Sequence, residues 1–125
     1  MVPMIIAVNV VGALVGTGLG RASTIAIADV EDSQIVSWEE YEVRWDLSHD
    51  QPVQSPTGEA RPSHGTHHGR IVSFMKEHNV QVVVTGHVGP PMAHTLDLMG
   101  IAVVTGAIGD ARQAAVDAAQ LVIHG

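Results

Sequence analysis

Residues 80–91 read VQVVVTGHVGPP, an apolar, β-branched run that is followed by a turn and two prolines. The run at 80–85 is apolar enough for a central strand in a sheet that is covered on both faces. The turn contains Gly86, His87 and Gly89, and the prolines suit the first turn of a helix. A strand, a short turn and a helix in this order indicate an α/β fold, in which ligands bind at the carboxyl ends of strands.

The same periodicity extends this prediction in both directions along the chain. Strands are expected at residues 4–10, 23–30, 34–41, 80–85 and 101–105, and helices from about residues 64, 91 and 110. The connection between the second and third strands is too short for a parallel crossover, so these strands form a hairpin. We expect one domain over residues 1–125, with three layers and a mixed sheet. In the last helix the expected core stripe is Ala111, Ala114, Ala118 and Leu121.

Composition excludes several classes of function. Six basic and thirteen acidic residues give a net charge of −7 with histidine neutral, which argues against nucleic acid and against anionic membranes. The absence of cysteine excludes disulfides, thiolate-held iron–sulfur clusters and cysteine nucleophiles. No apolar run reaches the roughly 20 residues of a membrane span, and the apolar opening residues lack a basic region. We therefore expect a cytoplasmic protein.

A glycine-rich loop, GTGLGR at residues 16–21, is the first candidate site. It fails as a dinucleotide fingerprint, because a strand follows the loop where the fingerprint needs a helix. Arg21 is the only basic residue among the first 43. An arginine beside backbone N–H groups can hold an anion, although a surface ion pair explains Arg21 equally well.

The histidines are the second candidate site. The chain has eight, and His64, His67 and His68 fall within one turn of a predicted helix start. Imidazole is a ligand for borderline and first-row metals, and a helix N-terminus favours an anion. A metal-containing anion could use both features, and a solvated helix start without a ligand is the alternative.

The remaining polar and aromatic residues assemble no catalytic constellation. Eight of the thirteen carboxylates lie between residues 29 and 50, where alternation with apolar residues indicates a solvated hairpin face. Trp38, Tyr41 and Trp45 either cover the core or form a partner surface. Because no nucleophile, base and orienting group come together, we expect a protein that is not an enzyme.

Two short segments carry a resemblance to a known family. Gly20-Arg21-Ala22 and the stretch from Thr85 to Pro90, in their order and spacing, resemble the dinitrogenase iron–molybdenum cofactor biosynthesis family. These are accessory proteins that carry or bind nitrogenase cofactor precursors. The resemblance implies a ribonuclease-H-like α/β/α fold with a five-stranded mixed sheet. Many relatives place His-Phe where this chain has Gly18-Leu19.

The cysteine-free, histidine-rich chain also resembles the orange-protein branch of that family, whose members hold a molybdenum–copper sulfide cluster without covalent attachment. The resemblance implies a carrier of such a cluster, or of an iron–molybdenum cofactor precursor. It places the ligand against Gly20, Arg21, Gly86, His87 and Gly89, with metal ligands at His64, His67 and His68. Cofactor-assembly proteins or P-loop ATPases are the implied partners, and the oligomeric state stays open.

Two other classes of function are weighed beside a carrier. The first is a metal-free regulatory or docking module that uses a face with Trp38 and Trp45. The second is a ribonuclease-H-type hydrolase, which needs carboxylates for two metals at the carboxyl edge of the sheet. Asn9 stands near the end of the first strand, where such a hydrolase would have an acid.

Overall fold

The computed structural model describes residues 4–45 and 63–124, with side chains described at 4–45 and 69–121. The elements, in chain order, are β1 Met4–Val11, β2 Leu14–Val15, a 3-10 turn η1 Leu19–Arg21, β3 Thr24–Glu31, β4 Gln34–Glu42, α2 Ser63–Glu77, β5 Val82–Val84, α3 Pro90–Leu98, β6 Ala102–Val104 and α4 Ala111–His124. No helix in this part of the chain is long and apolar enough to cross a membrane.

The six strands form one mixed sheet in the order β4-β3-β1-β5-β6, and β2 pairs with β1. Strand β1 runs antiparallel to β3 and parallel to β5, and β6 is parallel to β5. The predicted α/β class and mixed sheet are confirmed, but the predicted number of five strands is wrong. The sixth strand is β2, which turns back on β1 after Gly12, whose φ is +63°. Two residues are too few to show any periodicity, so the sequence pattern does not reveal β2.

The predicted hairpin is formed by β3 and β4, in which Glu31 pairs with Gln34. The two residues between them, Asp32 and Ser33, have φ values of 50° and 64°. Two left-handed residues make the type of two-residue turn whose twist matches that of the flanking strands.

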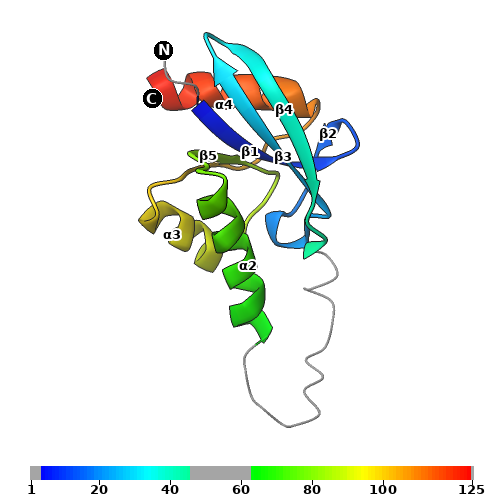
Figure 1. Ribbon diagram of the computed structural model, residues 1–125, viewed down its shortest axis with the longest axis vertical. Helices are drawn as coiled ribbons and strands as arrows, with labels where there is room; N and C mark the ends of the chain where they lie inside the picture. Colours follow the sequence, from blue (N-terminus) through cyan, green and yellow to red (C-terminus); the bar gives the residue numbers. More distant parts are fainter. Residues whose placement is uncertain (1–3, 46–62, 125) are drawn as a thin grey trace.

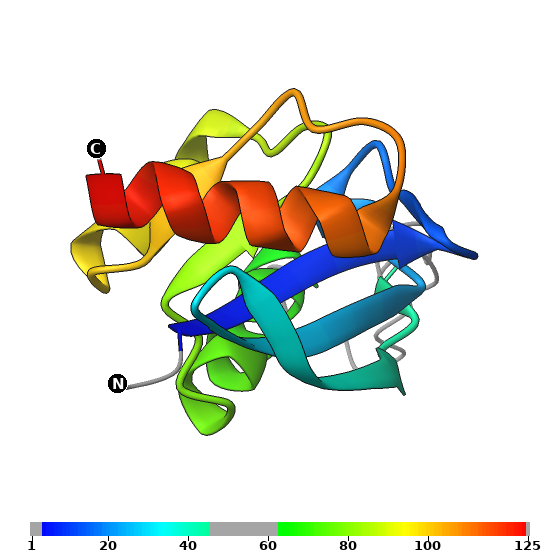
Figure 2. The same cartoon turned by 90° about the horizontal axis from the view of Figure 1, so that it is seen from above.

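Helices pack against both faces of the sheet (Figure 1). Ala7, Ile25 and Val83 belong to a core with α2 and α3, whereas their neighbours Val8 and Ala26 belong to a core with α4. Successive side chains of a strand point to opposite faces, so buried strands with apolar residues at every position supply both cores. Figure 2 shows α4 lying across one face of the sheet and α2 on the other side.

The core stripe of α4 differs from the prediction. Ala111 and Ala118 are buried as expected, but Leu121 is 61% exposed, and Ala115 and Ala119 are buried instead. With about 100° per residue, positions i, i+4, i+7 and i+8 face the sheet together, and position 121 falls at the rim of that stripe. The stripe consists of alanines, which let α4 lie close to the sheet.

Two helices are followed by a residue in the left-handed conformation. Asn79 follows α2 with a φ of 55°, and Gly100 follows α3 with a φ of 80°. At both ends the next amide reaches back five residues: Val80 N donates to Met75 O at 3.0 Å, and Ile101 N donates to Leu96 O at 2.9 Å. This is the Schellman arrangement, which needs a left-handed residue and therefore favours glycine or asparagine.

Candidate functional site

Three parallel strands, β1, β5 and β6, end at the same edge of the sheet. After β1 the chain continues to β3 on one side, and after β5 it continues to β6 on the other side. In open α/β sheets, ligands bind at the point where the connections from two neighbouring strands leave toward opposite sides. The loops at this carboxyl edge are residues 12–23, 85–89 and 105–110.

A row of backbone hydrogen bonds joins these loops through three glycines, and we call it the glycine ladder. Gly106 N donates to Gly86 O at 2.9 Å, Gly86 N to Gly16 O at 2.9 Å, and Gly16 N to Asn9 O at 2.7 Å. A Cβ atom on Gly86 would lie 3.0 Å from Thr17 Cα and 3.1 Å from Gly16 O. The absence of side chains is therefore what lets the first two loops touch.

The turn that carries Arg21 lies directly against the turn that carries His87. Leu19 N donates a hydrogen bond to His87 O at 2.9 Å, and the Leu19 side chain is fully buried. On the other side of the turn, Trp45 N donates to Ala22 O at 2.8 Å. The structure thus brings together Gly20, Arg21, Gly86, His87 and Gly89, with both charged or titratable side chains exposed.

A buried polar pair underlies this junction. Asn9 is 1% exposed and Thr85 is fully buried, and Asn9 Nδ2 donates to Thr85 Oγ1 at 3.1 Å. Thr85 Oγ1 in turn donates to His87 O at 3.3 Å. Sequence reasoning noted Asn9 but missed Thr85. The signal was a hydroxyl at the end of an otherwise apolar strand, because such a group needs a partner once it is buried.

The helix starts at this edge differ in what they offer to an anion. Helix α3 begins with Pro90 and Pro91, which have no backbone N–H to donate. At α4 the carboxylate of Asp110 already accepts from Gln113 N at 2.8 Å and balances the positive end of the helix. Each start therefore offers fewer backbone donors than an uncapped helix without prolines, so the side chains of the two joined turns are the better candidates.

The predicted metal ligands His64, His67 and His68 fall in the first turns of α2, whose backbone is helical as expected. Their side chains lie outside the described residues, so a role in metal binding stays a prediction. Figure 1 shows this end of α2 projecting away from the sheet. Within residues 4–45 and 69–121, no three His, Asp or Glu side chains are close enough to hold a metal ion.

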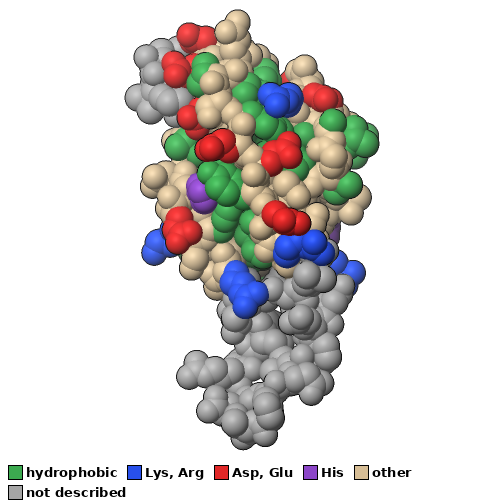
Figure 3. Space-filling model, turned by 45° about the vertical axis from the view of Figure 1, so that its right-hand side comes forward, with side chains coloured by type: hydrophobic (Ala, Val, Ile, Leu, Met, Phe, Trp, Pro, Cys, Tyr) green, Lys and Arg blue, Asp and Glu red, His purple; other side chains and the backbone are tan. Residues whose placement is uncertain are grey.

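Sequence reasoning did not single out two further basic residues, Arg44 and Arg70. Arg44 N donates to Ser23 O at 3.1 Å, two residues beyond Arg21. Arg70 lines a cavity of about 490 Å³ between the end of β4 and α2, together with Trp45 and Phe74. Figure 3 shows several basic side chains gathered toward one end of the molecule, below a surface with scattered acidic side chains. Basic side chains are therefore concentrated on this part of the described surface.

The proposed docking face with Trp38 and Trp45 does not exist as one surface, and that prediction is wrong. Trp45 is buried in the core under α2, with its ring 5.5 Å from that of Phe74. Trp38 packs on the opposite face of the sheet, where Arg112 of α4 lies 4.5 Å over its ring. The pleat of β4 directs Trp38 to one face of the sheet, and the turn after β4 brings Trp45 to the other face.

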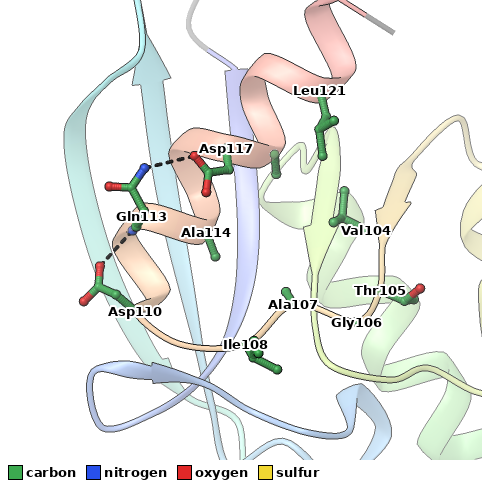
Figure 4. Close-up of a pocket in the computed structure, with 11 residues that line it drawn as sticks. Val104, Thr105, Gly106, Ala107, Ile108, Asp110, Gln113, Ala114, Asp117 and Leu121 are labelled. Carbon is green, nitrogen blue, oxygen red and sulfur yellow. Dashed lines mark hydrogen bonds between the residues drawn. The ribbon is translucent and has the colours of Figure 1, made fainter.

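A second cavity, of about 330 Å³, lies between β6, the 105–110 loop and α4 (Figure 4). Its walls are aliphatic, with Val104, Ile108 and Leu121 among them, and no basic residue lines it. Its polar groups are joined to one another, since Gln113 Nε2 donates to Asp117 Oδ1 at 2.9 Å. An acidic, aliphatic cavity does not suit an anionic ligand.

The fold and this edge define a small mixed α/β domain with glycine-rich loops at the carboxyl edge of its sheet and exposed Arg21 and His87 side chains. Residues 2–121 match the family model for dinitrogenase iron-molybdenum cofactor. The chain belongs to this family, as the resemblance in its sequence predicts. Among curated proteins, none matches the chain significantly.

Solved structures share the fold. The protein PH0822 is 21% identical, with a TM-score of 0.65, and the match covers 92% of this chain and 90% of that one. The apo form of the orange protein from Desulfovibrio gigas is 21% identical, with a TM-score of 0.61 and coverage of 98% and 88%. A candidate dinitrogenase from Methanocaldococcus jannaschii is 13% identical, with a TM-score of 0.60 and coverage of 94% and 92%.

Proposed function

We propose that this protein binds and carries a metal–sulfur cofactor or cluster, held without covalent attachment at the carboxyl edge of the sheet. The observation that carries the proposal is the hydrogen bond from Leu19 N to His87 O, because it joins the Arg21 turn to the His87 turn. The family model and the fold shared with the orange protein agree with a role in cofactor binding. The role is binding and delivery, without catalysis.

The chemistry of the edge suits an anionic cluster. Arg21 supplies a permanent positive charge and directed donors, and His87 supplies an imidazole that can reach a borderline metal. Gly20 and Gly89 present backbone without side chains, so a bulky inorganic anion can approach closely, and Gly86 keeps the neighbouring loop in contact with this turn. Since the chain has no cysteine, sulfide must come with the cluster. A molybdenum–copper sulfide cluster or an iron–molybdenum cofactor precursor meets these needs.

His64, His67 and His68 complete the proposed site as ligands from the start of α2. The two core clusters on either side of the sheet support a three-layer, ribonuclease-H-like fold in one domain over residues 1–125. Cofactor-assembly proteins or P-loop ATPases would deliver or receive the cluster in the cytoplasm. The histidine ligands, the fold and the partner proteins all belong to this one proposal.

The test is reconstitution with tetrathiomolybdate and copper, followed by desalting, metal analysis and visible absorption. The wild-type protein should retain molybdenum and copper with charge-transfer bands. Arg21→Ala should retain at least about tenfold less, since hydrogen bonds to charged groups contribute roughly 1.5–3 kcal/mol. Arg112→Ala is the matched control, because that arginine lies over Trp38 on the α4 face.

A combined His64→Ala, His67→Ala and His68→Ala variant tests the second half of the site and should also lose retention. Full retention in both this variant and Arg21→Ala would refute the proposed location. A wild-type protein that stays colourless and ignores both thiomolybdate and copper would refute the carrier function. That outcome would favour a metal-free docking module.

A further inference from the structure

The hydroxyl of Thr85 occupies the centre of the junction beneath the proposed site. It accepts from Asn9 Nδ2 at 3.1 Å and donates to His87 O at 3.3 Å. A threonine hydroxyl has one proton to donate and lone pairs with which to accept. Because Asn9 is an amide and can donate, the single proton of Thr85 is left for the His87 carbonyl.

The carbonyl of His87 receives two hydrogen bonds from different directions. One comes from the Thr85 side chain below it, and the other comes from Leu19 N at 2.9 Å. Together they fix the peptide plane between His87 and Val88. Fixing that plane sets the direction in which the His87 side chain leaves the turn, and it ties the position of Leu19 to the same point.

We propose that Thr85, held by Asn9, is a positioning residue for the cluster site. This inference rests on the proposed function, in which Arg21 and His87 contact the cluster. Thr85 itself is fully buried and does not touch the ligand. Its role is to hold the two contacting turns in one relative arrangement, so that the bound geometry exists before the ligand arrives.

The test uses Thr85→Val, which keeps the shape of the side chain and removes the hydroxyl, and Thr85→Ser, which keeps the hydroxyl. Affinity for the tetrathiomolybdate–copper cluster is measured by visible titration, well below the melting temperature of each variant. Thr85→Val should bind about 3- to 10-fold more weakly, the range expected for one hydrogen bond, and Thr85→Ser should bind within twofold of wild type. Thr95→Val is the matched control, since Thr95 Oγ1 donates to Pro91 O within α3.

A second readout does not depend on the ligand. The amide of Leu19 should exchange with solvent faster in Thr85→Val than in the wild-type and Thr85→Ser proteins, because its acceptor is held less firmly. If the valine variant does not fold, Thr85→Ala is measured in its place.

The outcomes separate the two proposals. Weaker binding with faster Leu19 exchange, both restored by serine, supports the positioning role. A Thr85→Val protein that melts lower but binds like wild type, with unchanged Leu19 exchange, overturns that role and leaves the carrier function standing. A wild-type protein that binds no cluster overturns the carrier function and the positioning role together.

Discussion

Gly16 packs against the side chain of Asn9 with no room for a methyl group. A Cβ atom at this position would lie 2.5 Å from Asn9 Oδ1, 2.8 Å from its Cγ and 2.9 Å from its Nδ2. Favourable contacts between heavy atoms begin near 3.5 Å, so Gly16→Ala forces a shift of up to about 1 Å. Asn9 is 1% exposed and is bonded to Thr85, so its carboxamide cannot swing away freely.

The cost has two parts. Overpacking in a well-packed interior costs about 1–3 kcal/mol, and loss of the Asn9–Thr85 hydrogen bond adds about 1 kcal/mol. We therefore expect Gly16→Ala to lower the free energy of unfolding by about 2–4 kcal/mol. For a chain of this size, that corresponds to a melting temperature lower by roughly 6–20 °C.

The assay is thermal unfolding followed by circular dichroism, with urea unfolding for the free energy. Gly18→Ala is the matched control, because a Cβ at Gly18 meets nothing within 4 Å and its φ of −143° suits any residue. That variant should stay within about 0.5 kcal/mol of wild type or gain slightly in stability. The Asn9→Ala and Gly16→Ala double variant should lose about 1–2 kcal/mol less than the sum of the single losses, since the clash is gone. A Gly16→Ala protein as stable as Gly18→Ala would refute the reasoning.

Three further predictions concern the rest of the described structure. Desolvation first, and then the hydrogen bond and charge of Glu39, raise the pKa of Tyr41 above 10.0; the folded state then holds this proton more tightly than the unfolded state, so stability falls as pH rises above 10. Absorption of the phenolate, read on the only tyrosine, should show this raised pKa and a lower value in Glu39→Gln. Asp110→Ala removes the cap on Gln113 N and should cost about 1 kcal/mol in urea unfolding, whereas Asp110→Asn should cost less than half of that. Gly100→Ala places a side chain at a φ of 80° and should cost about 1–2 kcal/mol, and an unchanged melting temperature would contradict the Schellman ending of α3.

The pattern of apolar and polar residues along the chain was sufficient to predict most of the fold. The apolar runs around Val8 and Val83 predicted strands that are buried on both faces, and the short link at residues 31–33 predicted the hairpin. The phase of α4 was missed because alanines at 111, 114, 115, 118 and 119 allow more than one stripe. Only contact with the sheet decides between them, and Leu121 stands outside the chosen stripe.

The residues of the candidate site could be singled out from the sequence, but the contacts between their turns could not. Arg21 and His87 stood out by charge and by their position after apolar strands, and topology explains why they meet at one edge. The link through Leu19 N depends on the path of a glycine-rich loop, which periodicity does not describe. The separation of Trp38 from Trp45 likewise depends on how the chain turns after β4.

Strand β4 has a further consequence for the behaviour of the protein in concentrated solution. It is nine residues long and pairs with no other strand on its outer side among the described residues, so this edge is a template for pairing with another copy. Glu39, Glu40 and Glu42 are exposed along this strand, and two copies would have to bring these charges together. At neutral pH the repulsion opposes the addition of a foreign strand. Substitution of these three glutamates with glutamine would remove that barrier, so such a variant should aggregate through this edge more readily than the wild-type protein.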